Sequence, residues 1–460
     1  MHRYLRWTLI AVGLAIPLGV AGFFIGMRHQ PLTPAQQLAL QRLSAPTPPV
    51  QGADASDLVW LLDLDVPEDR RAEVAAKVRE FERQRGPGGA TRRDPRLDWP
   101  AFPALPKDGK GLCAMAVPGC IAYVAENRKL VAATLEANAG ALASQARIAD
   151  FDGYRRGFPV NVYESVPNLG QFRRLRTTDI ALRFTSSLPL PAVDEVCRDL
   201  AGWRRVGGDS DDVLVSMIGV AWVREDLMLL ADMLAKLPKE MPLPDQCAAA
   251  LATSDASEFD LCPAARSTFG FYRRMREFNA AGKQGRRVPE WWVDWPRLNA
   301  RIAADIGRLC DPSLTAQLQT DAPASSLLPL APSCSKWERR ADPVGCELYE
   351  SVRSELHVHY LDRRGDQAQM LALMRTVDWL RLQVDSKEAV PQALAHLPPE
   401  LGLLRTPEYD LEHDRISIPL HDVSRAPRFE LAAGADARPV SRRKPRCCSR
   451  RPSRNLAALD

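Results

Sequence analysis

The sequence predicts a mainly α-helical protein: a single N-terminal transmembrane helix, then a stacked helical-hairpin domain with a small C-terminal β ribbon. Three observations predict this fold class. An uncharged apolar run lies near the N-terminus, amphipathic helical patterns joined by short linkers fill the middle, and apolar residues begin to alternate at Ile416. The chain has 460 residues, of which 46% are hydrophobic. It is therefore long enough to bury a core.

The apolar run covers residues 7–27 without a single charged side chain. As an α-helix it would be about 31 Å long, enough to cross the hydrocarbon core of a bilayer. Because His2, Arg3 and Arg6 precede it, the positive-inside rule keeps the N-terminus in the cytoplasm and exports the rest. The alternative is a signal peptide cleaved at the small residues 19–21. We favour the anchor, since the apolar run continues well past a signal-peptide core.

Both alternatives deliver the residues after about position 30 to an oxidising compartment, where neighbouring cysteines form disulfides. In the stretch "GLCAMAVPGC", a Pro-Gly turn lies between Cys113 and Cys120 and can bring them within bridging range. Their spacing matches neither the zinc-site nor the thioredoxin pattern. Cys334 and Cys346 repeat the arrangement around another proline-containing turn. We predict a disulfide in each pair.

Four further cysteines of the exported part allow three connectivities, which the sequence cannot separate. We pair Cys197 with Cys247, because both lie in helical patterns that flank one long helix. In the chain-entropy model, closing that loop contributes about 4 kcal/mol. The pairing of Cys262 and Cys310 stays open. The adjacent cysteines 447–448 are counted as unpaired.

Composition divides the chain into five segments. They are a cytoplasmic stub and transmembrane anchor (1–28), a Pro-rich tether (29–56), a helical-hairpin periplasmic domain (57–400), the β ribbon (401–432) and a basic disordered tail (433–460). The tether is assigned from its five prolines and near absence of charge.

The clearest helices lie between residues 177 and 253. The first carries its apolar residues on one face behind Pro191 and ends at "GG" 207–208. The second covers 211–237, with "DSDD" as its cap and acidic first turn, and the third begins in "PLPDQCAAAL". Short linkers between successive helices imply antiparallel neighbours, so we predict stacked helical hairpins.

Weaker helical patterns complete the domain. They cover residues 67–86, 121–151, 302–309, 347–364 and 367–384. After them, alternating apolar residues in "RISIPL" predict a strand that pairs with "RFELA" as an antiparallel ribbon. Pro419 indicates that this strand lies at an edge.

Several stretches together carry a resemblance: "VWLLDLDVP", "CAMAVPGC", "CRDLAGWRRVGGDSDDVLVSMIGVAWVREDLMLLADML" and "PPELGLLRTPEYDLEHDRISIPL". They resemble a group of membrane-anchored, periplasmic helical proteins of Gram-negative bacteria, over roughly residues 57–432. The resemblance implies a location in the cell envelope. It attaches no activity to the chain, so no functional residue is carried over.

The C-terminal tail departs from this pattern. Eight of the 61 basic residues and one of the 57 acidic residues lie in 438–460, so the rest of the chain has a net charge of −3 and not the overall +4. A basic arm that docks on anionic lipid or envelope polymer is one interpretation. We favour a solvated, disordered extension.

Two groups of histidines are candidate metal ligands. His357 and His359 are two residues apart on a predicted helix, about 200° around its axis, so they cannot hold one ion together. The second group lies at 408–422, where His413 and His421 accompany several carboxylates, Glu412 and Asp414 among them. This combination suits a divalent metal, but its spacing fits no established motif and is also ordinary turn chemistry.

A tryptophan cluster, "WWVDWP", contains Trp291, Trp292 and Trp295. It can form an aromatic platform for a sugar or a peptide. Between two prolines, packing of a loop onto the helical core is the favoured interpretation.

These observations favour a membrane-anchored interaction or scaffolding protein of the bacterial inner membrane, with one span and its C-terminal domain in the periplasm. Its expected partners are membrane lipid along residues 7–27 and an envelope protein or peptide, and not nucleic acid. No catalytic residue and no cofactor is predicted, because phosphate loops, nucleophile elbows and HExxH motifs are missing from the sequence. The alternative is a periplasmic metal-dependent hydrolase that uses the His/carboxylate cluster at 408–422.

Overall fold

The computed structural model describes residues 31–434 except 86–92, 115–117, 159, 161–169, 171, 187, 282–287, 354–355 and 425, together with residues 15, 18, 19, 22 and 26. The predicted anchor at 7–27 lies mostly outside the described residues, and so does the tail beyond residue 434. Within the described part, none of the helices combines the length and apolarity that crossing a membrane requires.

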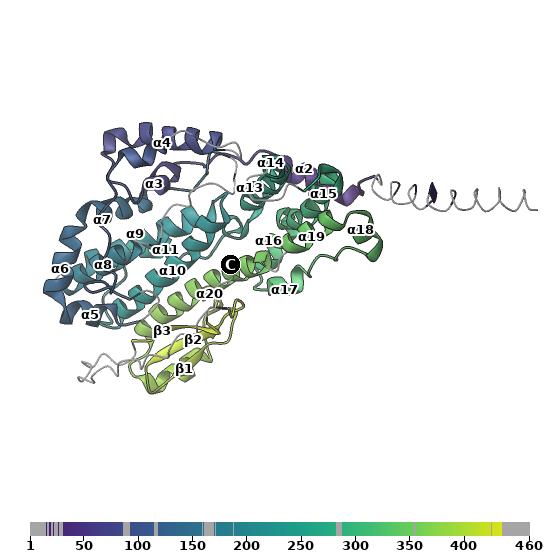
Figure 1. Ribbon diagram of the computed structural model, residues 1–460. Helices are drawn as coiled ribbons and strands as arrows, with labels where there is room; N and C mark the ends of the chain where they lie inside the picture. The colour runs from purple at the N-terminus through teal and green to yellow at the C-terminus, as the bar shows by residue number, and fades with distance from the viewer. Residues whose placement is uncertain are drawn as a thin grey trace, which may run out of the picture.

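The described chain is mainly helical, with one small antiparallel sheet near its C-terminal end (Figure 1). The N-terminal helices are α2 (Pro34–Ser44), α3 (Ser56–Trp60), α4 (Glu68–Gln84), α5 (Cys120–Glu126), α6 (Arg128–Ala137) and α7 (Ala139–Ala146), with the 3-10 turns η1 (Pro95–Asp98) and η2 (Arg147–Asp150). The central helices are α8 (Arg173–Thr185), α9 (Pro189–Gly208), α10 (Val213–Leu234), α11 (Asp245–Ala250), α12 (Ala256–Phe259), α13 (Cys262–Arg273) and α14 (Met275–Ala281).

The C-terminal part contains η3 (Glu290–Trp292), α15 (Trp295–Ile306), η4 (Gly307–Cys310), α16 (Pro312–Leu318), α17 (Ala324–Leu327), α18 (Lys336–Ala341), α19 (Pro343–Val352) and α20 (Leu356–Gln383). It continues with η5 (Lys387–Ala389), α21 (Val390–Leu394), η6 (Pro399–Leu401) and the strands β1 (Glu408–Asp410), β2 (Arg415–Pro419) and β3 (Arg428–Ala432).

The largest core cluster forms around the α9–α10 hairpin. α9 packs along α10, and α10 also contacts α8, α20 and β3. This explains why α10 is apolar around most of its circumference, since helices buried on several sides have no polar face to keep in water. The predicted hairpin is confirmed: α9 ends at Gly208, and Asp212 caps α10 by accepting from the N–H of Leu214 at 2.7 Å.

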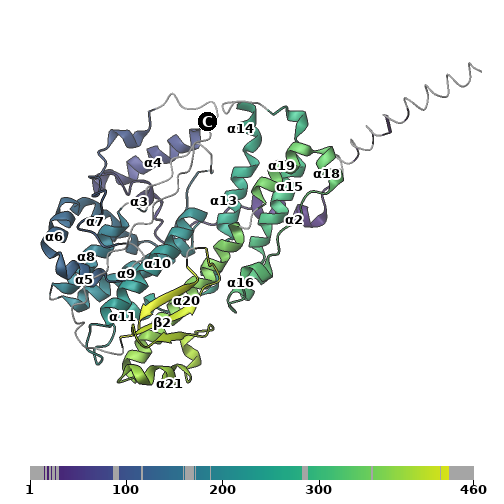
Figure 2. The same cartoon turned by 60° about the horizontal axis from the view of Figure 1, so that its bottom comes forward.

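A second core cluster joins α2, α13, α15 and α19. α20 contributes residues to both clusters, Leu361 to the second and Leu371 to the first. In Figure 2, α9 and α10 lie on one side of α20, and α15 and α16 lie on the other. The prediction of one tether over 29–56 is wrong for α2. Thr33 and Gln36 form a capping box, and Ala39 and Leu43 are buried against the second cluster. Pro34 occupies a first-turn position that tolerates proline, so it begins a helix instead of preventing one.

Two predicted helix boundaries are also wrong. The predicted helix 121–151 is divided at Asn127 and Asn138, whose backbones leave the helical region and whose side-chain amides donate to carbonyls one turn earlier. Conversely, the predicted helices 347–364 and 367–384 do not meet at a break, because α20 continues through Gly365. Packing on both core clusters supports a glycine that an isolated helix would tolerate poorly.

The predicted ribbon is confirmed, and it has a third strand. The strand order is β1-β2-β3, and Ile416 and Ile418 point into the first core cluster. The prediction that Pro419 marks an edge strand is wrong, because β2 is central. β1 pairs only as far as Ser417, so Pro419 lies beyond that ladder and its missing N–H leaves no pair incomplete on that side.

Four disulfides are present among the described residues. Cys113–Cys120, Cys197–Cys247 and Cys334–Cys346 confirm the three predicted pairs. The pairing that the sequence left open is Cys262–Cys310, which joins α13 to η4.

The α9–α10 contact depends on a glycine pair. A Cβ atom added to Gly219 would lie 2.8 Å from the Cα of Gly207, a backbone atom that cannot rotate away. We expect Gly219→Ala to lower the free energy of unfolding by about 1–3 kcal/mol, because the hairpin must separate. The matched control is Gly270→Ala in α13, where a Cβ meets nothing within 4 Å and helix propensity favours alanine by about 0.5–1 kcal/mol. Urea unfolding followed by circular dichroism measures both, and equal effects would contradict the packing argument.

Candidate functional site

A groove of about 520 Å³ lies beside the Cys334–Cys346 disulfide, and we name it the α15 groove. Its volume falls in the range of about 300–1,000 Å³ that is typical of ligand sites. It is lined by Gln36, Arg301, Ala304, Asp305, Arg308, Pro329, Leu330, Ala331, Pro332, Ser333, Cys334, Glu338 and Tyr349. These residues come from α2, α15, η4, α18, α19 and the segment 329–334.

One wall of the α15 groove is the segment 329–334, which has no regular secondary structure. Side chains of neighbouring elements hold its backbone. Arg308 Nη1 donates to the carbonyl of Pro329 at 2.7 Å, and Arg353 Nη1 donates to that of Ala331 at 2.9 Å. Tyr349 donates its hydroxyl to the carbonyl of Pro332 at 3.4 Å. Prolines also restrict the backbone, so this wall is formed before any ligand arrives.

α15 contributes another wall of the groove. Asp294 caps this helix, and its side chain accepts from the N–H of Arg297 at 3.1 Å. Arg301 and Asp305 lie one turn apart on this helix and therefore share a face. Arg301 Nη2 pairs with Glu338 Oε1 at 2.8 Å, which joins α15 to α18. The groove thus presents charges of both signs.

Burial perturbs two titratable groups in the α15 groove. It raises the pKa of Asp305, although Arg308 and Arg353 oppose this. Burial, together with the neighbouring carboxylate of Asp305, raises the pKa of Tyr349 to about 12. The Tyr349 hydroxyl therefore keeps its proton at neutral pH and remains a hydrogen-bond donor.

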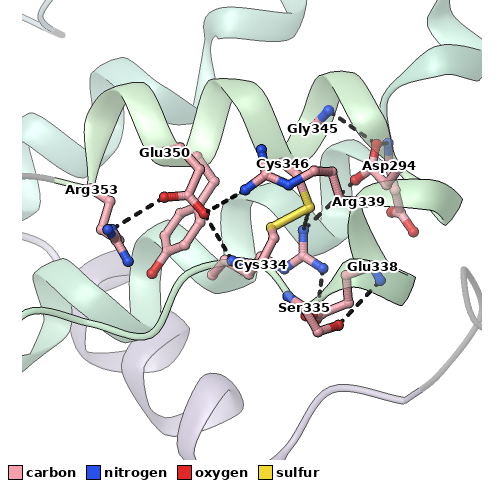
Figure 3. Close-up of a disulfide and its surroundings, with 12 residues drawn as sticks. Asp294, Cys334, Ser335, Glu338, Arg339, Gly345, Cys346, Glu350 and Arg353 are labelled. Atoms are coloured by element: carbon pink, nitrogen blue, oxygen red, sulfur yellow. Dashed lines mark hydrogen bonds and ion pairs between the residues drawn. A yellow bond between two sulfur atoms is a disulfide. The ribbon is translucent and has the colours of Figure 1, made fainter.

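The Cys334–Cys346 disulfide borders the α15 groove through Cys334, and Figure 3 shows its surroundings. Cys334 precedes α18, and Ser335 caps that helix in a capping box with Glu338. The Cys334 N–H donates to Glu350 Oε1 at 2.9 Å, which ties the start of the loop to α19. The covalent bond and these hydrogen bonds together keep Glu338 in place on the groove wall.

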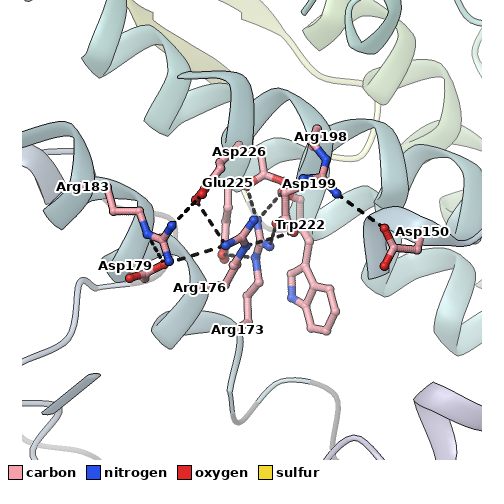
Figure 4. Close-up of polar contacts among 11 residues, drawn as sticks. Asp150, Arg173, Arg176, Asp179, Arg183, Arg198, Asp199, Trp222, Glu225 and Asp226 are labelled. Carbon is pink, nitrogen blue, oxygen red and sulfur yellow. Dashed lines mark hydrogen bonds and ion pairs between the residues drawn. The ribbon is translucent and has the colours of Figure 1, made fainter. Parts of the chain in front are cut away.

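A second polar cluster lies in the first core, around Arg173 (Figure 4). The Arg173 guanidinium contacts both Asp199 and Asp226, and its Nε lies 3.7 Å from Glu225 Oε2. Burial raises the pKa of Asp226 well above its usual range, while Arg173 opposes this. Because Arg173, Asp199 and Asp226 are almost completely buried and face one another, we interpret the cluster as structural.

The structure does not bring the candidate metal ligands together. His413 Nδ1 lies 2.7 Å from Asp410 Oδ2, which raises the pKa of His413, and His421 Nε2 lies 3.4 Å from Asp321 Oδ1. The whole of β2 separates the two histidines, a span of roughly 20 Å. The two histidines of the candidate metal set therefore do not lie close together in the ribbon.

The two carboxylates of that candidate set have other roles. Asp414 accepts from the Tyr409 hydroxyl at 2.7 Å and has a φ of 50° in the β1–β2 turn. Glu412 belongs to the same turn, where its N–H donates to Asp410. Within the described ranges, no group of three or more His, Cys, Asp or Glu side chains is arranged to hold a metal ion.

The other sequence candidates are scattered. His359 Nδ1 lies 3.5 Å from Asp422 Oδ1, and the side chain of His357 lies outside the described residues. Trp295 is buried in the second core cluster, as the core-packing interpretation predicts, but Trp292 is 45% exposed. The side chain of Trp291 is not described.

No protein-family model matches the chain, and neither a curated protein nor a solved structure is significantly similar to it. The resemblance to membrane-anchored periplasmic proteins therefore stays a prediction.

No sequence motif predicts the α15 groove. Its charged residues come from two stretches of the chain about 30 residues apart, with Arg301, Asp305 and Arg308 in the first and Glu338 in the second. One signal was available in the sequence: the short Cys334–Cys346 loop indicates a segment that must be held in place.

Proposed function

We propose that the chain is a membrane-anchored interaction module whose α15 groove binds an extended segment of an envelope protein. In this proposal a single N-terminal span holds the protein in the bacterial inner membrane, and the helical domain lies in the periplasm. The observation that carries the proposal is the groove itself, with one preformed wall and a volume of about 520 Å³.

The wall chemistry suits a polypeptide better than a small polar metabolite. Pro329, Leu330 and Pro332 are exposed along one side, and Leu330 retains 48% of its surface. Apolar side chains of a bound segment can pack on these residues, while Arg308 and Asp305 of the other wall offer a donor and an acceptor. A wall that is already ordered reduces the entropy lost on binding.

The position of the α15 groove supports a role close to the membrane. Gln36 of α2 is one of the lining residues, and α2 begins only seven residues after the predicted span 7–27. α2 also packs on α15, so α2 and the groove wall form one unit.

Site-specific photocrosslinking in intact cells tests this proposal. A photoreactive residue at Ser333 in the groove wall is expected to give one reproducible adduct, and mass spectrometry is expected to map it to a single extended segment of one envelope protein. The same residue at Leu97 in η1, which is 68% exposed, is the control position and is expected to give no such adduct.

A variant that fills the groove sharpens the test. Ala304→Phe places a ring among the lining residues and is expected to reduce the Ser333 adduct about tenfold, a loss of about 1.4 kcal/mol of binding free energy, because the ring occupies space that the bound segment needs. Its thermal unfolding midpoint shows whether the fold is retained. Two results would refute the proposal. One is that Ser333 and Leu97 give the same adducts, and the other is that the Ser333 adduct persists in a folded Ala304→Phe variant.

A further inference from the structure

The Cys334–Cys346 disulfide presents its two sulfur atoms to different surroundings. Cys334 lines the α15 groove, whereas Cys346 lies in α19, is fully buried and is not part of the groove lining. Cys334 is 9% exposed and Cys346 0%. A thiolate that enters the groove therefore reaches Cys334 before Cys346, and Cys346 is the group that it displaces.

The surroundings of Cys346 favour its departure as a thiolate. Arg301 Nη1 lies 3.4 Å from Cys346 Sγ and can donate to it, and Cys346 also lies in the first turn of the ten-residue helix α19. A guanidinium and a helix N-terminus both lower the pKa of a cysteine thiol. Arg301 also pairs with Glu338 at 2.8 Å and with Asp342 at 4.0 Å, and Asp342 caps α19 as well. The interaction that favours a Cys346 thiolate is therefore the Arg301 N–H directed at the sulfur.

The other three disulfides lack this arrangement. In each of them a sulfur atom contacts a backbone carbonyl oxygen at 3.8–4.0 Å, which disfavours a thiolate. Cys113 and Cys120 do border a cavity, but its volume of about 20 Å³ holds roughly one water molecule. Cys197 and Cys247 are completely buried.

We propose that Cys334–Cys346 is an exchangeable disulfide that a dithiol reductant opens from the α15 groove, with Arg301 as the positioning residue for the leaving sulfur. One thiolate of the reductant attacks Cys334 Sγ and forms a mixed disulfide, while the Cys334–Cys346 bond breaks and Cys346 takes the electron pair as a thiolate. The second thiolate of the reductant then attacks the reductant sulfur of the mixed disulfide. A disulfide forms within the reductant, and Cys334 is released as a thiolate.

The reaction is balanced without a further reactant. The reductant loses two electrons and becomes a disulfide, the protein gains two cysteine thiols, and the protons of the two reductant thiols pass to the cysteines. Opening the bond removes the covalent constraint on residues 335–345, which include the lining residue Glu338, so the redox state is expected to change access to the groove. The exchange itself does not depend on what the groove binds.

The test is a timed reduction of the purified full chain under native conditions. Dithiothreitol is the reductant, free thiols are trapped by alkylation at intervals, and mass spectrometry measures each pair separately. We expect Cys334–Cys346 to open at least about tenfold faster than any other pair. The other three pairs serve as an internal control for global unfolding. If the protein unfolded, all four disulfides would be exposed to the reductant and would open together.

Two variants separate exchange through the groove from simple exposure. Arg301→Gln is expected to slow the opening of Cys334–Cys346 by about three- to tenfold, because the leaving thiol becomes less acidic. Ala304→Phe is expected to slow the opening of Cys334–Cys346 with both reductants. The effect should be larger with glutathione than with dithiothreitol, because glutathione is bulkier. The matched control is Arg276→Gln, which removes one exposed guanidinium that pairs with Glu290 and is expected to leave the rate unchanged.

Two results would overturn the inference. One is a wild-type time course in which all four pairs open together or another pair opens first. The other is an Arg301→Gln variant, with its remaining three disulfides intact, that opens Cys334–Cys346 as fast as the wild type or faster.

Discussion

Replacing Arg173 by methionine is expected to lower the free energy of unfolding by about 3–5 kcal/mol, the usual effect of removing one partner from a buried ion pair. The guanidinium of Arg173 is enclosed, contacts both Asp199 and Asp226, and lies over the ring of Trp222 with 5.6 Å to its centroid. Methionine fills similar space but leaves the carboxylates without a counter-charge. Urea unfolding of the oxidised protein at pH 7.5 measures the loss.

The loss should also depend on pH. Burial already raises the pKa of Asp226 in the folded protein, and Arg173 opposes that rise. Without Arg173, the pKa of Asp226 in the folded protein rises further above its value in the unfolded chain. A carboxyl group of this kind favours folding below its unfolded pKa, and that contribution is lost as the pH rises through the folded pKa. Arg173→Met is therefore expected to be less destabilised, relative to wild type, at pH 5 than at pH 7.5.

Arg183 on the same helix provides the matched control. It pairs with Asp179 and Glu195, but its side chain is 48% exposed, so Arg183→Ala is expected to cost less than about 1 kcal/mol. Adding Asp199→Asn and Asp226→Asn to Arg173→Met should restore part of the lost stability, because the unpaired charges disappear. If Arg173→Met and Arg183→Ala had equal effects, or the loss had no pH dependence, the electrostatic account of this cluster would fail.

Removing the Cys197–Cys247 disulfide has the second large expected effect. The double variant Cys197→Ala, Cys247→Ala is expected to lose about 4 kcal/mol of unfolding free energy, since the bond closes a loop with a sequence separation of 50 residues. In the folded protein the bond joins α9 to α11 within the first core cluster. Urea unfolding of the variant and of the wild type, with the other three disulfides verified intact, measures the difference.

A short loop gives the comparison that tests this reasoning. Cys113 and Cys120 are seven positions apart, and their removal by the same double alanine substitution is expected to cost about 2 kcal/mol. The two cost estimates differ because a longer loop has more unfolded conformations to lose. Equal losses for the two pairs would mean that native-state contacts, and not loop closure, set the contribution of each bond.

Local patterns predicted much of the fold. The helix ending at Gly208, the cap at Asp212 and the antiparallel ribbon at Ile416 all depend on residues that are near one another in the chain. Predictions failed where packing outweighs composition. The proline-rich stretch 29–56 was expected to be a tether, yet Ala39 and Leu43 bury a helix against α15.

The candidate site was less predictable than the fold. Several carboxylates and histidines lie close together in the sequence at 408–422, which indicates a metal site. In the structure, a strand of five residues separates His413 from His421. The residues that line the α15 groove are not clustered in the sequence in this way. The groove brings together Arg301, Pro332 and Cys334, because α15, α18 and α19 pack together. No sequence spacing predicts that these residues lie close to one another.

The sequence by itself determined the helical character, the hairpin and the two short-range disulfides Cys113–Cys120 and Cys334–Cys346, because short turns and helix faces constrain these features locally. The Cys197–Cys247 pair was one of several possible connectivities, and the packing of α11 on α9 decided it. Only the tertiary structure decided that Arg173 is enclosed with Asp226 and that Arg301 faces the sulfur of Cys346. These contacts join residues 45 or more positions apart, and which side chains meet across such separations depends on how whole helices pack.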